Sequence, residues 1–482
     1  MSGKNESCGP PQSGTGKGGK YDLAVIGAGS AGFSAAITAA DQGAQVALIG
    51  HGVIGGTCVN VGCVPSKALI RATGAVHHAN TASRFAGVSA KGRVVDWAAL
   101  RRQKDELVAS LRQAKYTDLL PEYDRVAYLE GKARLCNGGV SLDGRHIEAG
   151  KVIIATGSGE FVPPIPGMND IPFLTSRSAF ELDDLPQSMI VLGGGYIGCE
   201  LAQMFARAGA SVTILFRSRL LPEGEPEISE ALAACLGEEG VRVQRVQSYD
   251  SVARTKSGIA LSVRIGGSLR KMASRHLLLC AGRAANTDGL GLADAGVEVL
   301  PNGGVKVDDH MRTTKSGVYA AGDVTGRDQF VYMAAYGAKI AARNAMNGDT
   351  LVYDNTAMPA VVFTDPQAAS AGMTQASAQA RGMQVKTSVL TLDNVPRALA
   401  ARDTRGLIKL VADSATGKLI GAHILAPEGA DAIQTAALAI RKGMTYGELG
   451  EMIFPYLTTV EGLKLAAQTF DMDISKLSCC AG

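Results

Sequence analysis

Two glycine-rich turns, each between an apolar run and a small-residue stretch, constrain the fold of this chain more than any other feature. The first stands in KYDLAVIGAGSAGFSAAITAADQGAQVALIG and the second in SMIVLGGGYIGCELAQMFARAGASVTILFRSR. In each, the apolar run predicts a buried strand, the glycines a tight turn, and the next residues a helix that ends at Gly43 or Gly209 and leads into another strand. Two such βαβ units imply that the chain binds two nucleotides.

Each unit carries glycines at the GxGxxG spacing of a dinucleotide-binding turn. The first glycine allows the turn, the second lets the backbone approach a pyrophosphate, and the third lets the helix pack on the strand, while the helix amino terminus favours the phosphates. A domain that merely packs its glycines tightly is the alternative, but the position between strand and helix favours nucleotide binding. The glycines are Gly27, Gly29, Gly32, Gly193, Gly195 and Gly198.

The two units differ where their second strands end. A carboxylate that binds a ribose usually stands there, yet VALIGHG places Gly50 at this position, so the adenosine contact of the first nucleotide is unassigned. The second unit ends in Phe216, Arg217 and Arg219. Two arginines without an acid suit a 2′-phosphate, so NADPH is preferred over NADH; two solvated surface arginines are the alternative.

Changes of pattern divide the chain into domains. Residues 1–20 are polar and Gly-rich, which predicts a flexible leader. The stretch KVIIATGSGEFVPPIPG predicts a strand that enters a Pro-rich crossover between the first two domains. From about residue 351, strands such as AVVFT and LIKLVAD alternate with helices such as DAIQTAALAIRKG, which predicts a third, α+β domain.

Charge and composition exclude several classes of protein. Lys and Arg number 48 against 45 Asp and Glu, so nothing favours nucleic-acid binding. No run of about 18 apolar residues and no signal-peptide pattern is present, which predicts a cytoplasmic protein without membrane insertion. Nine cysteines are an odd number, and in a reducing compartment cysteine pairs are better explained as redox-active or metal-binding than as cross-links.

The stretch IGGTCVNVGCVPSKALI holds the most specific cysteine pair. Cys58 and Cys63 stand at the start of a predicted helix, with Pro65 in its first turn. A helix amino terminus lowers the pKa of a thiol, so the pair can cycle between dithiol and disulfide. A metal knuckle normally has shorter spacing, and structural packing is the remaining alternative.

The other cysteines fall into two groups. Cys479 and Cys480 are adjacent near the chain end, where they could close only a strained ring, so we interpret them as two soft ligands on a flexible arm. The isolated cysteines are expected to be small buried hydrophobes, and Cys8 in the leader is expected to be incidental. These isolated cysteines are Cys136, Cys199, Cys235 and Cys280.

With GGTCVNVGCVPSK, both GxGxxG units, ATG at 155–157 and AAGDV at 320–324, the chain resembles the flavoprotein disulfide reductases from residue 20 onward. The resemblance implies a glutathione-reductase-like α/β fold with two Rossmann-like domains, FAD on the first unit, NADPH on the second, and a C-terminal α+β domain that forms a homodimer. The implied parts are a leader at 1–20, an FAD domain at 21–157 and 283–350, an NADPH domain at 158–282 and a dimerisation domain at 351–482.

The same resemblance implies roles for individual residues. Cys63 is the thiol nearest the flavin and Cys58 the one that exchanges with substrate. Lys67 pairs with Glu200 beside the flavin ring, and Asp323 contacts the ribityl or phosphate region. The remaining implied cofactor contacts are Thr57, Thr156, Gly157, Gly282 and Arg283.

One departure from the pattern of the disulfide reductases limits the substrates that this chain can reduce. Disulfide reductases use a histidine, positioned by a carboxylate, to protonate the leaving thiol; here FPYLTTVEGLKLAAQTF has Phe454 and Thr459 at those positions, and Glu461 cannot be assumed to substitute. Cysteine thiolates select soft metal ions, and an ion held by two sulfurs can pass between cysteine pairs by ligand exchange. This chemistry favours a soft divalent metal ion over a disulfide as substrate.

The stretches FPYLTTVEGLKLAAQTF, TAMPAVVFTDPQ, TLDNVPRALA, DTRGLIKLV and LSCCAG resemble the mercury-reducing branch of this family. The resemblance implies NADPH-driven reduction of Hg(II), delivered as a thiol complex, to volatile Hg(0), with the tail cysteines of one subunit serving the active site of the other. Tyr116 and Tyr456 match tyrosines placed around the metal; ordinary half-buried aromatics are the alternative. Many members carry a separate metal-binding domain; we expect none in this protein, and we expect the leader to be a vestigial linker.

Two other hypotheses remain open at this point. The tail cysteines could be a redox relay in a disulfide reductase of unusual substrate, which the absent histidine disfavours. Alternatively, the chain could sequester metal through its thiols, with nucleotide units that are only structural.

Overall fold

The computed structural model describes residues 20–474, and the chain forms two compact units. Unit 1 takes its residues from Met1–Pro65, Arg102–Phe161 and Arg283–Asp354, and unit 2 from Ser66–Arg101, Val162–Gly282 and Asn355–Gly482. Cys8, Cys479 and Cys480 lie outside the described residues. Within residues 20–474, no helix is both long and apolar enough to cross a bilayer.

Unit 1 is built on a sheet that continues the first predicted βαβ unit. The strands of this sheet are β1 (Tyr21–Ile26), β2 (Val46–Gly50), β3 (Val126–Glu130), β4 (Ala133–Cys136), β5 (Gly139–Leu142), β6 (Arg145–Ile154) and β16 (Val318–Ala320), and β7 (Ser158–Glu160) and β15 (Arg283–Ala285) form a separate two-stranded sheet. The helices of unit 1 are α1 (Ser30–Ala40), α2 (Gly56–Val61), α8 (Leu292–Ala295) and α9 (Val331–Asn347). Helices α3 (Cys63–Asn80) and α4 (Trp97–Arg112) contain residues of both units.

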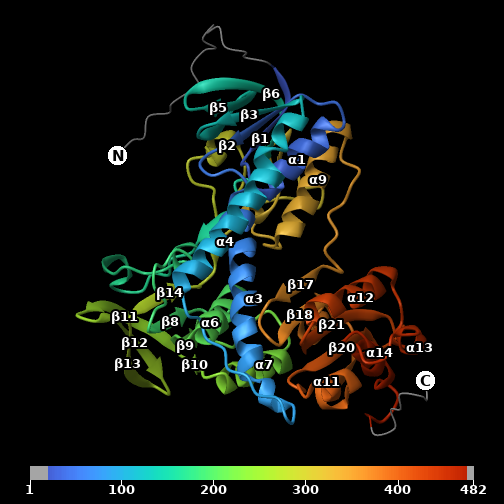
Figure 1. Cartoon of the computed structure of the whole chain (residues 1–482). Coiled ribbons are helices and arrows are strands. Elements are labelled where there is room, and N and C mark those ends of the chain that lie inside the picture. Colours follow the sequence, from blue (N-terminus) through green and yellow to red (C-terminus); the bar gives the residue numbers. More distant parts are fainter. Residues whose placement is uncertain (1–19, 475–482) are drawn as a thin grey trace. The chain divides into compact units, whose positions relative to one another are not determined.

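The sheet order is β3-β2-β1-β6-β5-β4, with β16 also paired to β6. Pairing is parallel from β3 through β1 to β6 and β16, and antiparallel from β6 to β4. Alternate residues of these strands, including Ala24, Ile26 and Ile154, form a buried core on one face. On unit 1, α1 and α9 lie side by side (Figure 1), and Ser34 Oγ donates to Ala335 O at 2.9 Å.

Unit 2 contains the second βαβ unit and the predicted α+β part. Its strands are β8 (Ser188–Leu192), β9 (Ser211–Phe216), β10 (Arg242–Arg245), β11 (Ser248–Thr255), β12 (Gly258–Ile265), β13 (Ser268–Ser274), β14 (His276–Leu279), β17 (Pro359–Val362), β18 (Gln367–Gly372), β19 (Val385–Thr391), β20 (Leu407–Asp413) and β21 (Leu419–Ala426). Its helices are α5 (Ser176–Ala179), α6 (Tyr196–Ala208), α7 (Pro226–Glu238), α10 (Gln375–Ala380), α11 (Pro396–Ala401), α12 (Gly429–Lys442), α13 (Tyr446–Glu451) and α14 (Glu461–Gln468).

These strands form a parallel sheet, β10-β9-β8-β14, an antiparallel sheet, β11-β12-β13, and a five-stranded antiparallel sheet, β17-β18-β21-β20-β19. The long apolar strands β20 and β21 are buried on both faces: residues such as Ile408 and Ile424 pack with α12, α13 and α14 in one core, and Leu407 and Leu425 belong to another buried cluster of unit 2. The predicted fold class, two Rossmann-like nucleotide-binding folds and an α+β part, is confirmed; the predicted domain boundaries stay a prediction.

Two details differ from the sequence-based expectations. The stretch VVDWAALRRQKDELVASLRQAKYTDLL, residues 94–120, has the pattern of one long helix, but α4 ends at Arg112 and continues as a π-helical turn over Gln113–Thr117. Of the four isolated cysteines, only Cys199 and Cys235 are buried. Cys136 and Cys280 are half-buried, because Cys136 lies at the end of a short strand, 3.3 Å from His146 Nδ1, and Cys280 lies just beyond β14.

Candidate active site

The first glycine turn has the close contacts that its spacing predicts. Gly27 has φ +116°, and a Cβ there would lie 2.2 Å from Ala155 O. A Cβ on Gly32 would lie 1.7 Å from Gly27 O, so only glycine lets α1 pack onto the turn. Gly29 precedes α1 and would meet only an ordinary contact, 3.5 Å from Gly56 Cα. The turn therefore presents bare backbone at a helix amino terminus, which fits a pyrophosphate.

The second turn repeats this geometry in unit 2. Gly193 has φ +123° and its Cβ would lie 2.1 Å from Cys280 O, while a Cβ on Gly198 would lie 2.0 Å from Gly193 O. Gly195, before α6, has no atom within 4 Å of its Cβ position. In each turn two glycines are required by close packing, and the middle glycine has no contact tighter than an ordinary one.

The two arginines after β9 are used differently. Arg217 is exposed, whereas Arg219 is half-buried and donates to Pro222 O at 2.8 Å and Gly224 O at 2.7 Å. Arg245, at the end of the neighbouring β10, donates from Nε to Arg217 O at 3.1 Å. Arg217 therefore has the more available guanidinium, and Arg245 adds positive charge that the sequence pattern alone did not reveal.

The cysteine loop is built onto the first glycine turn. Gly55 N donates to Ala28 O at 2.9 Å, and a Cβ on Gly56 would lie 2.6 Å from Gly29 Cα. Cys58 lies in α2 and Cys63 opens α3, and both are half-buried. A helix start favours thiolate, so the backbone places both sulfurs where soft nucleophiles or ligands are expected.

Gly62 sets the turn between the two cysteines. A Cβ there would lie 2.9 Å from Thr57 O and 3.3 Å from Cys58 Cα, so a side chain at this position would collide with the backbone of α2. The loop can therefore return from Cys63 onto the backbone around Cys58. Among residues 20–474, no group of three or more His, Cys, Asp or Glu side chains could hold a metal ion.

Tyr116 lies beside the cysteine loop, although 53 residues separate it from Cys63 in the sequence. Its ring meets Phe33 edge-on with centroids 4.8 Å apart and would lie 3.1 Å from a Cβ on Gly55. Burial, opposed by a hydrogen bond with Ser30 and reinforced by Cys58 and Cys63, raises the pKa of its phenol. The π-helical turn that ends α4 thus brings a neutral phenol to the thiols.

A second group of predicted residues surrounds Asp323. Ser158 Oγ donates to Asp323 Oδ2 at 2.7 Å, and Arg283 donates from Nε to Ser158 Oγ at 2.8 Å. Gly322 has φ +79° and lies close to Ala31 of α1, which places Asp323 near the first glycine turn. Ser158 was not predicted from the sequence, although its position directly after Gly157 was an available signal.

The ATG segment and the segment after Gly282 are tied together. Thr156 Oγ1 donates to Asn286 O at 2.7 Å, and Asn286 Nδ2 returns a bond to Thr156 O at 2.9 Å. Gly157 and Gly282 have φ +71° and φ +118°, with no atom within 4 Å of either Cβ position. Strands β7 and β15 pair next to this junction, so these residues shape the backbone where the chain leaves and re-enters unit 1.

Lys67 and Glu200 form the ion pair that the resemblance implied. Lys67 Nζ lies 2.7 Å from Glu200 Oε2 and 4.8 Å from the centroid of the Phe363 ring. Glu200 is buried, and its Oε1 accepts from Phe363 N at 2.8 Å. Phe363 was not predicted as a site residue, although it stands in the stretch TAMPAVVFTDPQ. The pair is thus present in unit 2, and its position beside a flavin remains a prediction.

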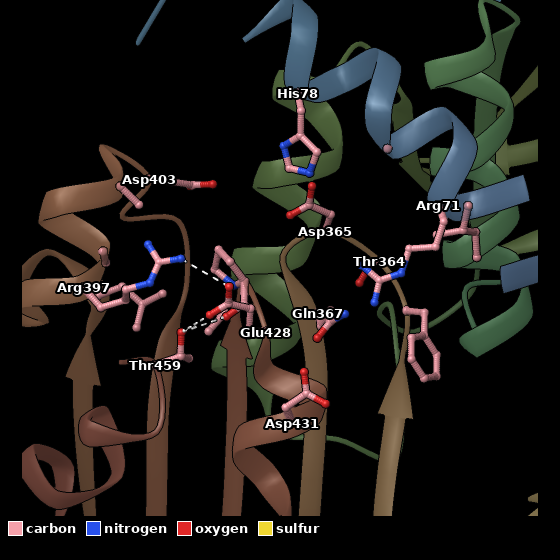
Figure 2. Close-up of a pocket in the computed structure, with 18 of the residues that line it drawn as sticks. Arg71, His78, Thr364, Asp365, Gln367, Arg397, Asp403, Glu428, Asp431 and Thr459 are labelled. Atoms are coloured by element: carbon pink, nitrogen blue, oxygen red, sulfur yellow. Dashed lines mark hydrogen bonds and ion pairs between the residues drawn. The ribbon is translucent and has the colours of Figure 1, made fainter. Parts of the chain in front are cut away.

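Unit 2 also has a pocket of about 460 Å³ that is lined in part by Lys67 and Phe363. Figure 2 shows Arg397 and Thr459 both reaching Glu428, with Arg397 Nη2 3.2 Å from Oε1 and Thr459 Oγ1 3.1 Å from Oε2. Thr459 stands where disulfide reductases have a carboxylate, and it contacts the carboxylate of Glu428 instead. The charge of Glu428 is balanced by its ion pair with Arg397.

The turn before α14 carries Phe454 and Tyr456. Phe454 packs against the core of β20, β21 and α12, whereas Tyr456 is 54% exposed. Glu461 accepts from Leu457 N at 3.1 Å, where Leu457 has φ +62°. Glu461 therefore holds the backbone of this turn and is not placed to position a proton relay. The structure brings Tyr116 to Cys58 and Cys63, and shows Tyr456 exposed on unit 2.

Comparison with known proteins extends these observations over nearly the whole chain. Residues 21–361 match the model of the pyridine nucleotide-disulphide oxidoreductase family, and residues 358–467 match that of its dimerisation domain. The mercuric reductase of Streptomyces lividans is 45% identical over 96% of this chain and 98% of its own length. Mercuric reductases of Bacillus cereus and Shigella flexneri are 45% and 46% identical, over 73% and 84% of their lengths.

Solved structures give the same fold. The HOCl-induced flavoprotein disulfide reductase RclA from Escherichia coli superimposes with a TM-score of 0.81 at 30% identity, covering 93% of this chain and 99% of that one. LpdA from Mycobacterium tuberculosis gives a TM-score of 0.82 at 28% identity, over 93% of this chain and 99% of its own.

Proposed function

Because this chain belongs to the mercuric reductases of the pyridine nucleotide-disulphide oxidoreductase family, we propose that it uses NADPH to reduce Hg(II) to volatile Hg(0). It is an oxidoreductase that uses FAD and NAD(P)H as cofactors, and its match to the dimerisation domain supports a homodimer. One combination of features carries the proposal. The chain has two cysteines at helix starts, and it has Phe454 at the position where a disulfide reductase needs a proton-donating histidine.

The cofactors are assigned to the two glycine turns. The bare backbone of Gly27, Gly29 and Gly32 would hold the FAD pyrophosphate, and that of Gly193, Gly195 and Gly198 would hold the NADPH pyrophosphate. When bound, the two cofactors supply the two electrons that the reduction needs. Arg217 and Arg219 would bind the 2′-phosphate, with Arg217 the more available. The further proposed cofactor contacts are Thr57, Lys67, Thr156, Gly157, Glu200, Gly282, Arg283 and Asp323.

The chain's own thiols would move the substrate. Hg(II) favours two sulfur ligands, so it can exchange from a small-thiol complex onto Cys479 and Cys480 of the partner subunit, and then onto Cys58 and Cys63. Each exchange forms one Hg–S bond as another breaks, so the ion is never released free. Tyr116, as a neutral phenol beside the cysteine loop, would close the site or offer an oxygen ligand, and Tyr456 is proposed to do so from the partner subunit.

The mechanism requires a reducing compartment, and we propose the cytoplasm. Both cysteine pairs must remain thiols between turnovers, and a reducing cytoplasm maintains that state. When Hg(II) accepts two electrons it becomes a neutral mercury atom, which thiolates bind weakly. The product can therefore leave without a proton being delivered to a sulfur leaving group, which is consistent with Phe454.

The test compares three oxidants under excess small thiol. NADPH oxidation is followed with Hg(II), oxidised glutathione or lipoamide, while mercury vapour is trapped. NADPH loss with Hg(II), matched by Hg(0), and little loss with either disulfide is the expected result. Turnover with a disulfide and no vapour would instead establish a disulfide reductase with a cysteine relay. Turnover of Hg(II) with NADH as readily as with NADPH would refute the assignment of Arg217 and Arg219.

Handover is tested separately. Replacing Cys479 and Cys480 with alanine should abolish turnover of Hg(II)–thiol complexes but spare turnover of small halide complexes, because halides can exchange directly onto Cys58 and Cys63. Equal activity of this variant on both kinds of complex would refute a transfer role for the tail.

A further inference from the structure

The carboxyl end of β2 lacks the acidic residue that commonly binds the ribose of a nucleotide on such a fold. Gly50 stands there, and its carbonyl accepts from Gly131 N at 2.9 Å. The neighbouring strand β3 runs parallel to β2, with Glu130 directly beside Gly50. Both strands thus end at the edge of the sheet that carries the first glycine turn.

No side chain fits at Gly50 without displacing its neighbours. A Cβ there would lie 2.4 Å from Tyr128 Oη, 2.8 Å from Tyr128 Cε2 and 2.9 Å from Ala28 Cβ. The phenolic oxygen of Tyr128 therefore occupies the space where a side chain of residue 50 would begin. Ala28 belongs to the glycine turn itself, so this oxygen lies next to the proposed phosphate site.

Tyr128 and Glu130 share one face of β3, because side chains two residues apart point the same way along a strand. Tyr128 is half-buried and Glu130 is exposed. Within residues 20–474 neither side chain makes a hydrogen bond or ion pair. Burial, and then the charge of Glu130, raises the pKa of Tyr128, which keeps its phenol protonated as a donor.

We propose that Tyr128 and Glu130 together replace the carboxylate missing at Gly50 and bind the hydroxyls of the adenosine ribose of FAD. The carboxylate of Glu130 accepts from a ribose hydroxyl and the phenol of Tyr128 donates to the other. The ribose-binding carboxylate is thus supplied by Glu130 on β3 and not by the last residue of β2. This inference rests on the proposed placement of FAD on the first glycine turn.

The test measures binding of FAD to flavin-free protein through quenching of flavin fluorescence. Tyr128→Phe removes only the phenolic oxygen and should weaken FAD binding about fivefold, as expected for one neutral hydrogen bond. Glu130→Gln keeps the shape and removes the charged acceptor, so it should weaken binding about tenfold. Tyr21→Phe, at the opposite end of β1, and Glu148→Gln, on the antiparallel part of β6, are matched controls and should bind FAD like the wild type.

Two ligands separate ribose recognition from damage to the fold. FMN lacks the adenosine half, so its affinity should be the same in the wild type and both variants. ADP should compete with FAD about tenfold better than 2′-deoxy-ADP in the wild type, and this preference should be lost in the double variant. FAD affinities of both variants within about twofold of the wild type, or an unchanged preference for ADP, would overturn the inference. Wild-type protein that takes up no flavin would overturn the proposed function as well.

Discussion

Gly29 and Gly56 meet through their backbones: a Cβ on Gly56 would lie 2.6 Å from Gly29 Cα. Gly29 belongs to the first glycine turn, and Gly56 opens the helix that carries Cys58. The proposed phosphate site and the cysteine loop therefore hold each other in place. A change at this contact should affect flavin binding and thiol chemistry together.

Gly56→Ala should lower both flavin content and Hg(II) turnover. The new methyl group would collide with backbone, which cannot move as a side-chain tip can, and Gly56 has φ +68°. Gly52→Ala is the matched control, because Gly52 has φ +83° but no atom within 4 Å of its Cβ position. The flavin-to-protein absorbance ratio of the two purified variants checks this. Equal ratios would show that the Gly29–Gly56 contact is dispensable.

The cysteines should differ sharply in reactivity. Burial raises the pKa of Cys235 to about 11 and that of Cys199 further, so neither should be alkylated by iodoacetamide near neutral pH. Cys58 and Cys63, half-buried at helix starts, should react first in the reduced protein. Mass spectrometry after brief labelling gives the order. Labelling of Cys235 should rise only as the pH approaches its pKa, and early labelling of Cys199 would contradict the prediction.

Tyr116 should act as a neutral phenol throughout the working pH range. Burial, the largest influence, raises its pKa above the ordinary value of about 10, so ionisation should be absent below that pH. An ultraviolet difference titration of wild type against Tyr116→Phe should show the phenolate signal only above about pH 10. Phenylalanine keeps the ring contact with Phe33, so flavin content should not change. A phenolate signal near neutral pH would refute this assignment.

The Asp403–Arg405 pair in unit 2 should make the free energy of unfolding decrease in acid. Burial alone would raise the pKa of Asp403, but hydrogen bonds from Arg405 at 2.8 and 2.9 Å hold it below its usual value. The stabilisation is therefore fully present above the unfolded pKa of about 3.9 and is lost as the pH falls through the lower folded value.

Asp403→Asn should accordingly reduce stability by about 2 kcal/mol at neutral pH, as expected for charged hydrogen bonds. The difference in melting temperature between wild type and variant should stay constant at neutral pH and narrow below about pH 4. Asp393→Asn, which changes an exposed aspartate in the turn after β19, serves as the control. A difference that grows in acid would have the wrong sign for this mechanism.

Local sequence determined most of the fold, because its signals are short-range. The run YDLAVIG and the glycines after it predicted strand, turn and helix from periodicity and backbone conformation alone, and β1 and α1 match them. The same reasoning located Cys58 and Cys63 at helix starts. Family resemblance paired Lys67 with Glu200, which the structure shows 2.7 Å apart.

Only tertiary structure decided which distant residues complete the site. Tyr116 reaches the thiols because α4 ends in a π-helical turn, and no local pattern predicted that turn. Ser158 and Phe363 acquire their contacts through strand order and chain crossovers, which depend on long-range packing. The acid missing at Gly50 is the clearest case: the sequence showed the loss, and only the parallel pairing of β2 with β3 placed Tyr128 and Glu130 beside it. A linear sequence records neighbours along the chain, whereas a sheet makes neighbours of residues that hydrogen bonds bring together.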